Sequence, residues 1–316
     1  MKRGQSGLNL LVGVNKPKGL SSHDVVNHVR RALGERRVGH AGTLDPLATG
    51  VLVVGVGQAT RLLGMLTLDT KSYRSTIEFG TQTATDDAEG EVVATAPVPD
   101  CVADETFAKN TLASILGWQD QLPPAYSAIS VDGRRAYDRA RAGQEVELEP
   151  RRVCIQRAAL VSVEAGESVS WVVDFLVSKG TYVRSIARDL GPAVGTVAHL
   201  SALQRTCAGS VGLCACLSLE TLEALGAEGV AGRCLDPATA LQKPVRLLAR
   251  EELDDVACGR MLEAGLVWDD GVMRAAKDGE TLSLVYGKKL MGVWECRGTR
   301  LRCIVNFPDG ISGVRT

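Results

Sequence analysis

One carboxylate stands alone in a basic, glycine-rich stretch of the sequence. Asp45 is the only acidic residue between Arg36 and Arg61, and Arg37 and His40 lie a few residues before it. The proline that follows Asp45 disfavours helical geometry, so an extended or turn backbone presents the side chain. An ionised carboxylate in this setting could act as a nucleophile or a base. It could equally accept hydrogen bonds from nearby amides in an Asx-turn, and the residue types leave both roles open.

A second candidate group follows a Lys179-Gly180 turn. Tyr182 and Arg184 stand at the expected start of a helix, where two side chains and free backbone amides can face one cleft. Arg184 could be a bidentate partner of Asp45 or an ordinary surface arginine. His40 could stack on a nucleic-acid base or bond to its own loop.

Metal sites are not expected from the sequence. Asp86, Asp87 and Glu89 are close together, but a solvated hairpin turn explains them better than a cation site. The nine cysteines form no C-x-x-C pair, and only four histidines are present, so we expect reduced, mostly buried thiols and no zinc. No GxGxxG or Walker motif is present.

Hydrophobic periodicity predicts the elements that would position the Asp45 segment. A buried strand is expected over residues 8–14, and a helix with a serine cap and a terminal glycine over about 22–33. Residues 36–50 are too rich in glycine and proline to be regular throughout, and they lead into a β-branched strand at 51–56. A polar loop between a helix and a central strand is a common place for a site.

The whole sequence predicts an α+β protein with a larger domain over 1–243 and a small strand-rich domain over 244–316. The first contains a hairpin at 73–93, helices at about 104–117 and 134–142, and the strand, turn and helix around Tyr182. No signal peptide or membrane-spanning stretch is recognised, so a cytoplasmic location is expected.

The net charge of −1 would ordinarily argue against a nucleic-acid partner, but the charges are unevenly distributed. Residues 1–75, which contain Asp45, carry +7, and residues 76–150 carry −9. A local basic surface is therefore compatible with the sequence. Within the acidic segment one basic cluster occurs, made of Arg134, Arg135, Arg139 and Arg141.

These residues lie in blocks that resemble a known family, the bacterial tRNA pseudouridine-55 synthases of the TruB family. The blocks follow the family's order and spacing: NKPKGLSSHDVV, RRVGHAGTLDPLATGVLVVGVGQATRL, KSYR, GTQTATDDAEG, QLPPAYSAISVDGRRAYDRARAG, SKGTYVRSIARDLG and AHLSALQRT. The resemblance implies a catalytic domain with a central mixed, largely antiparallel sheet flanked by helices and loops. It also implies a T-arm-binding insertion at about 124–152 and, more weakly, a PUA-like RNA-binding domain from about 244.

The activity implied by the resemblance is the isomerisation of uridine 55 in the T-loop of tRNA to pseudouridine, without a cofactor or a protein partner. Asp45 matches the essential catalytic aspartate, which either attacks C1′ of the ribose or removes a proton from C2′. The target base must be flipped out of its stack to be reached. The arginine cluster in the insertion would be a clamp on the T-arm.

Five further residues match the family's substrate-binding positions. Tyr73 matches the tyrosine that stacks on the uracil and could act as a base at its C5. Tyr182 and Arg184 match residues that line the pocket and pair with the aspartate. Leu203 matches an apolar contact below the base, and His40 matches the histidine that fills the space left by the flipped nucleotide.

Three positions depart from the family pattern. Asn15 replaces an aspartate, Ser130 a lysine and Gln204 an arginine, so two cations expected near phosphate are neutral here. Two other functions remain as alternatives. One is a non-catalytic tRNA-binding or tRNA-folding protein on the same scaffold, and the other is a guide-RNA-dependent relative that needs protein partners.

Overall fold

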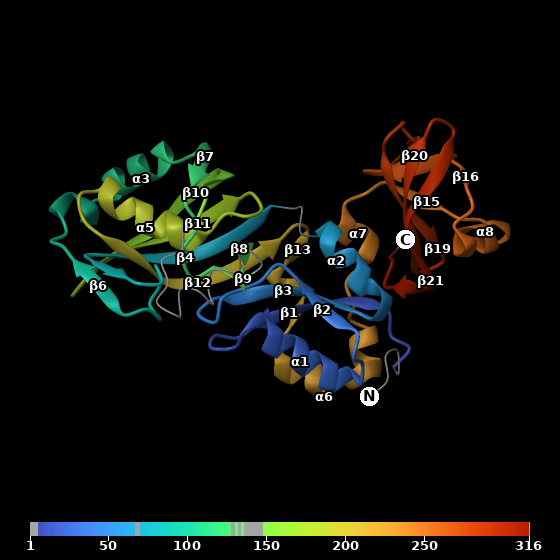
Figure 1. Ribbon diagram of the computed structural model, residues 1–316, viewed down its shortest axis with the longest axis horizontal. Coiled ribbons are helices and arrows are strands. Elements are labelled where there is room, and N and C mark those ends of the chain that lie inside the picture. The colour runs from blue at the N-terminus through green and yellow to red at the C-terminus, as the bar shows by residue number, and fades with distance from the viewer. Residues whose placement is uncertain (1–5, 67–69, 128–129, 132–133, 136–147, 316) are drawn as a thin grey trace. The chain divides into compact units, whose positions relative to one another are not determined.

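The computed structural model describes residues 6–66, 70–127, 130–131, 134–135 and 148–315 (Figure 1). Two compact units are present. Unit 1 contains Met1–Asp45, Gly50–Leu68 and Ala208–Thr316, and unit 2 contains Pro46–Thr49 and Asp69–Cys207. Asp45 is therefore the last residue before the chain first passes from unit 1 into unit 2. The expected domain boundary between residues 243 and 244 stays a prediction.

The first part of unit 1 is a small sheet with helices, formed by β1 (Leu10–Lys16), α1 (Ser22–Leu33), β2 (Val38–Ala41), β3 (Thr49–Val56), the 3-10 helix η1 (Gly57–Leu62), α2 (Leu63–Leu66), β13 (Val211–Gly212), η3 (Leu213–Ala215), β14 (Cys216–Leu217), α6 (Leu219–Ala231) and α7 (Pro237–Leu241). β3 pairs antiparallel with both β1 and β2, and β1 pairs parallel with β14. Valines fill β3 and are buried, which suits a central strand. The two strands expected around the Asp45 segment are confirmed.

The expected helix after β1 is confirmed as α1, and its ends have clear causes. Ser21 Oγ accepts a hydrogen bond from the Asp24 amide (3.1 Å), and the Asp24 carboxylate accepts one from the Ser21 amide (2.9 Å). Gly34 ends the helix in the left-handed conformation. The buried face, which includes Val25 and Val29, packs in one cluster with α6 and the sheet (Figure 1). Local capping and one apolar stripe thus fix α1.

The C-terminal part of unit 1 is rich in strands, as the sequence predicts. Its elements are β15 (Val245–Leu247), η4 (Arg250–Glu252), α8 (Leu253–Cys258), β16 (Leu262–Glu263), β17 (Leu266–Asp269), β18 (Val272–Ala275), β19 (Thr281–Tyr286), β20 (Lys289–Arg297) and β21 (Arg300–Ser312). The strands form one sheet in the order β16-β21-β20-β19-β15-β17-β18. Trp294 is fully buried in the core of this sheet.

In its described residues, unit 2 is a mostly antiparallel sheet covered by the helices α3 and α5 (Figure 1). Its elements are β4 (Lys71–Phe79), β5 (Thr81–Thr83), β6 (Val92–Thr95), η2 (Asp100–Ala103), α3 (Glu105–Ser114), β7 (Gly117–Gln121), β8 (Ser130–Val131), β9 (Arg134–Arg135), β10 (Arg151–Ala165), β11 (Val169–Val177), α5 (Val183–Ala193) and β12 (Ala198–Ala208). The strand order is β12-β4-β11-β10-β7, and β5 and β6 form a separate hairpin. Trp171 anchors the core by an edge contact with Phe79 and a 2.8 Å hydrogen bond to the carbonyl of Val102.

Two expectations for unit 2 are corrected. The hairpin expected over 73–93 is split, because β4 pairs with β11 and the tight hairpin is formed by β5 and β6. The helix expected at about 134–142 is wrong at residues 134–135, which form β9, and residues 136–142 lie outside the described part of the chain. Among the described residues, no helix is long and apolar enough to cross a membrane.

One ion pair is expected to stabilise the C-terminal sheet. Arg246, which is buried, donates to the carbonyl of Ala264 (3.0 Å) and to both carboxylate oxygens of Glu252 (2.6 and 3.1 Å). Glu252→Gln leaves that guanidinium without its negative partner, and we expect unfolding to become easier by about 2–3 kcal/mol in chemical denaturation at neutral pH. Glu251→Gln, at an exposed neighbour, is the matched control and should leave stability unchanged.

The effect of Glu252→Gln should depend on pH. Hydrogen bonds from Arg246 hold the pKa of Glu252 below its ordinary value of 4.5. A lowered folded-state pKa stabilises the fold above the unfolded pKa, and this contribution is lost as the pH falls through the folded-state value. The stability difference between wild type and Glu252→Gln should therefore shrink below about pH 4.5, and a difference that grows in acid would contradict this assignment.

Candidate functional site

His40 and Asp45 belong to unit 1, where His40 lies on a strand and Asp45 lies in the loop that follows that strand. His40 is half-buried in β2, opposite Val54 of β3, and Asp45 is half-buried in the loop that joins β2 to β3. The loop is anchored by Ser22, the first residue of α1. Ser22 Oγ accepts a hydrogen bond from the amide of Leu44 (2.8 Å) and donates one to its carbonyl (3.0 Å). Both backbone groups of the residue before Asp45 are thereby fixed.

Tyr73 and Leu203 lie on strands of unit 2. Tyr73 is buried in β4, opposite Phe175 of β11. Leu203 is half-buried in β12, and its carbonyl accepts a 3.4 Å hydrogen bond from Thr49 Oγ1. Both side chains expected to contact a base are thus carried by sheet strands, which hold position better than a loop does.

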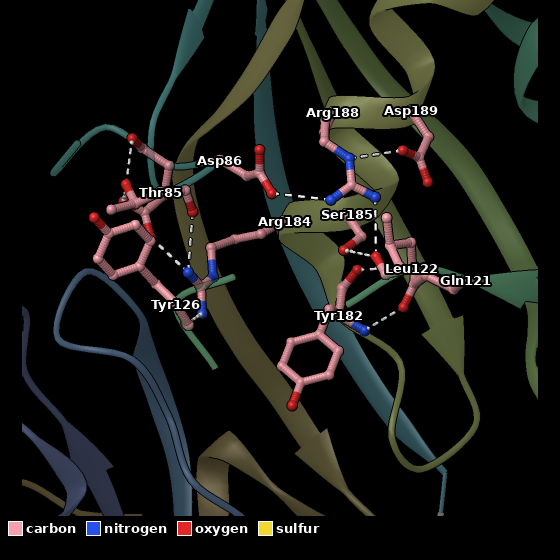
Figure 2. Close-up of polar contacts among 11 residues, drawn as sticks. Thr85, Asp86, Gln121, Leu122, Tyr126, Tyr182, Arg184, Ser185, Arg188 and Asp189 are labelled. Carbon is pink, nitrogen blue, oxygen red and sulfur yellow. Dashed lines mark hydrogen bonds and ion pairs between the residues drawn. The ribbon is translucent and has the colours of Figure 1, made fainter. Parts of the chain in front are cut away.

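Tyr182 is the N-cap residue of α5, and another residue satisfies its backbone. The buried side chain of Gln121 accepts a hydrogen bond from the Tyr182 amide (2.8 Å) and donates one to the Tyr182 carbonyl (3.1 Å), as Figure 2 shows. This two-point contact fixes the start of α5 where the tyrosine side chain cannot cap the helix. Sequence reasoning missed Gln121, since nothing in its local sequence indicates such a contact.

Arg184 is buried, so the interpretation as an ordinary surface arginine is wrong. It is 5% exposed in the first turn of α5. Nη1 donates to the carbonyl of Thr85 (3.0 Å) and lies 3.5 Å from Asp87 Oδ2, while Nη2 donates to the carbonyl of Tyr126 (3.0 Å) (Figure 2). A guanidinium held by this many acceptors has one orientation.

The turn that contains Asp86 and Asp87 corrects a further expectation. Glu89 is exposed, but Asp86 and Asp87 are buried rather than solvated. Two backbone hydrogen bonds connect the turn to β12. The Leu200 carbonyl accepts from the amide of Ala88, and the Leu200 amide donates to the carbonyl of Asp86, each at 3.0 Å. The sequence does contain one signal for this burial: Arg184 and Arg188 lie four residues apart on α5 and could form ion pairs with two adjacent aspartates.

Asp87 completes the turn with its own side chain. Its Oδ1 accepts hydrogen bonds from Thr85 Oγ1 (2.6 Å) and from the amide of Glu89 (3.1 Å), which leaves Oδ2 directed at Arg184. One carboxylate therefore shapes the turn and neutralises the buried arginine. Within the described residues, no group of three or more histidine, cysteine, aspartate or glutamate side chains could hold a metal ion.

Comparisons with known proteins place the chain in a family. A model described as the N-terminal domain of TruB family pseudouridylate synthases matches residues 30–183. The tRNA pseudouridine synthase B of Mycobacterium sp. (strain KMS) is 47% identical over 280 residues, which cover 87% of this chain and 91% of that protein. The chain belongs to the TruB family. The tRNA pseudouridine synthase B of Rhodococcus jostii, 44% identical, extends the TruB match to 95% of this chain and 97% of its own length.

Solved structures show that the TruB chain shares its fold with more distant proteins. A Cbf5-Nop10-Gar1 complex contains a chain with a TM-score of 0.70 and 20% identity, covering 98% of this chain and 88% of that one. An H/ACA RNP bound to a substrate RNA containing 2′-deoxyuridine gives a TM-score of 0.69 at 20% identity. The pseudouridine synthase fold, with a C-terminal region compatible with a PUA-like domain, is confirmed.

The pair of Arg184 and Asp87 can be tested by substitution. Asp87→Asn keeps the size of the side chain but removes the charge beside the buried guanidinium. We expect a loss of about 3 kcal/mol in unfolding free energy and a fall in the rate of pseudouridine formation on the order of 100-fold. Glu89→Gln, at the exposed acid of the same turn, is the control. Equal rates for the Asp87 and Glu89 variants would contradict the assignment.

Proposed function

We propose that the protein is a tRNA pseudouridine synthase that isomerises uridine 55, in the T-loop of the tRNA T-arm. The observation that carries the proposal is the 47% identity to a tRNA pseudouridine synthase B over 91% of that relative. Asp45 stands in the motif GHAGTLDPLATG, at the position of the family's catalytic aspartate. The bacterial relatives also support action in the cytoplasm.

The reaction is balanced without a cofactor. The N1–C1′ bond of uridine breaks, the base turns and a C5–C1′ bond forms, while C5 loses a proton and N1 gains one. We assign Asp45 as the carboxylate that acts at the ribose, by attack at C1′ or by removal of the C2′ proton. Either role requires the ionised form.

The other site residues would hold the base while it is detached. A base stacked in the T-loop must be flipped out, and His40 would fill the space that it leaves. Tyr73, which is buried in β4, would stack on one face of the uracil and Leu203 would contact the other. An apolar pocket of this kind keeps water away from C1′ and so prevents plain hydrolysis.

Tyr182 and Arg184 would complete the pocket from the start of α5. Arg184 is held by carbonyls and by Asp87, so its positive charge is in place before the RNA binds. Charges that are already oriented need no reorganisation during the reaction, which is where such groups are most effective.

RNA binding would depend mainly on surface cations and shape rather than on the pocket. We assign the insertion at about 124–152 as the T-arm clamp. Its arginines at 139 and 141 lie outside the described residues, as do the side chains of Arg134, Arg135 and Ser130. Ser130 and Gln204 supply no charge where the family has cations, so we expect the remaining arginines to carry the phosphate contacts.

A tritium-release assay tests the proposal. It uses tRNA transcripts that carry 5-tritiated uridine, because C5 loses its hydrogen in the reaction. Wild type alone should release one tritium for each tRNA. Asp45→Asn should release it at least about 1,000-fold more slowly, while its Kd for tRNA changes only a few-fold. Asp100→Asn, at an exposed aspartate of unit 2, is the control.

Three outcomes would decide against the proposal. Tight tRNA binding without release by wild type would favour the non-catalytic binding or folding protein. Release only after protein partners and a guide RNA are added would favour the guide-dependent relative. Release from a transcript in which uridine 55 is replaced by cytidine would show that the position is wrong.

A further inference from the structure

Two arginines on consecutive turns of α5 contact two consecutive aspartates of the 84–91 turn. Arg184 faces Asp87 at 3.5 Å. Arg188 Nη1 donates to Asp86 Oδ2 at 3.1 Å, as Figure 2 shows. The first pair belongs to the site described above. The second lies one helical turn further along α5, and no step of the reaction uses it.

Arg188 holds three groups with one guanidinium. Besides Asp86, its Nη2 donates to the carbonyl of Leu122 (2.9 Å) and its Nε to Asp189 Oδ1 (2.8 Å). The side chain of Asp189 is 56% exposed, so that contact adds little. The side chain of Asp86 is only 10% exposed, so its contact with Arg188 is shielded from water. The arginine therefore joins the 84–91 turn, through a partly buried bond, to the residue that follows β7, through an exposed one.

The segment that follows β7 is held to α5 at two backbone oxygens. The Leu122 carbonyl also accepts from Ser185 Oγ (2.9 Å), and the Tyr126 carbonyl accepts from Arg184 (3.0 Å) (Figure 2). Residues 122–127 contain the start of the insertion that is expected from about residue 124 to clamp the T-arm, and they are called the base of the insertion below. The first two turns of α5 thus hold the 84–91 turn and the base of the insertion together.

Asp86 has an unusual backbone that its surroundings maintain. Its φ is +59°, in the left-handed region, which costs a residue other than glycine roughly 1 kcal/mol. Its amide donates to the carbonyl of Thr83 (3.2 Å), and its carbonyl accepts from the amide of Leu200 (3.0 Å). Burial raises the pKa of Asp86, and the charges of Arg188 and Arg184 oppose that rise. Asparagine also tolerates the left-handed conformation, so replacing Asp86 by asparagine would keep the backbone and remove only the negative charge.

We propose that Arg188 is a positioning residue for pseudouridine formation, which acts by holding the 84–91 turn and the base of the insertion in register with Arg184. The inference rests on the proposed activity on tRNA. Loss of the contact to Asp86 would let the adjacent Asp87 shift, and with it the orientation of Arg184. A displacement near 1 Å at a reacting group can lower a rate by about 100-fold.

Four variants test the proposal by the single-turnover rate at saturating tRNA, the Kd for tRNA and the melting temperature. Arg188→Gln should lower the rate by about 10- to 100-fold with less than a threefold change in Kd. Asp86→Asn should lower it by about 10-fold, because the backbone is tolerated and only the charge is lost. The double variant should be no slower than Arg188→Gln, because both changes break one contact. Asp189→Asn, which removes only the exposed partner, is the matched control and should stay within twofold of wild type.

Arg188→Lys keeps the proposal testable if Arg188→Gln does not fold. Lysine keeps the charge near Asp86 but cannot donate in a fork to Leu122 as well, so it should restore part of the rate. The proposal is overturned by a wild-type rate in Arg188→Gln, by multiplicative effects in the double variant, or by an Arg188→Lys rate no higher than that of Arg188→Gln. Inactivity of the wild type on tRNA would instead overturn the proposed function and is seen before any variant is compared.

Discussion

A buried guanidinium imposes the main constraint on unit 2. Taking Arg184 out of water is unfavourable unless acceptors surround it, and two segments supply them. The 84–91 turn supplies the Thr85 carbonyl and the Asp87 carboxylate, and the segment after β7 supplies the Tyr126 carbonyl. Neither segment is regular where it meets the arginine. Their positions follow from the need to satisfy one charge, so the charge organises the loops rather than the reverse.

In unit 1, a neutral hydroxyl rather than a charged side chain holds an irregular segment in place. The Asp45 loop contains too much glycine and proline to be held by regular pairing, and a single hydroxyl on α1 fixes the residue before the aspartate. Ser22 can do this because the neighbouring Ser21 and Asp24 cap the helix and leave Ser22 available for the loop. Ser21 therefore caps the helix, and the adjacent Ser22 holds the loop.

Local signals in the sequence predicted much of the fold. The cap and apolar stripe of α1, the β-branched run of β3 and the short strands after residue 244 depend on neighbours in the chain, and each was confirmed. The pairing of Arg184 with the 84–91 turn joins residues about 99 positions apart and depends on a bridge to Leu200. No periodicity encodes such a contact, so the local sequence wrongly predicts that Asp86 and Asp87 are solvated. The roles of the site residues came from the family resemblance and not from local physics.

The contacts between α5 and residues 122–126 have a further consequence because they involve backbone oxygens. Every amino acid presents the same carbonyl, so substitutions at these two positions leave the attachment intact. The start of the insertion expected from about residue 124 is thus joined to α5 by contacts that do not depend on the side chains of Leu122 and Tyr126. The sequence of this segment can therefore change while its attachment to α5 stays the same.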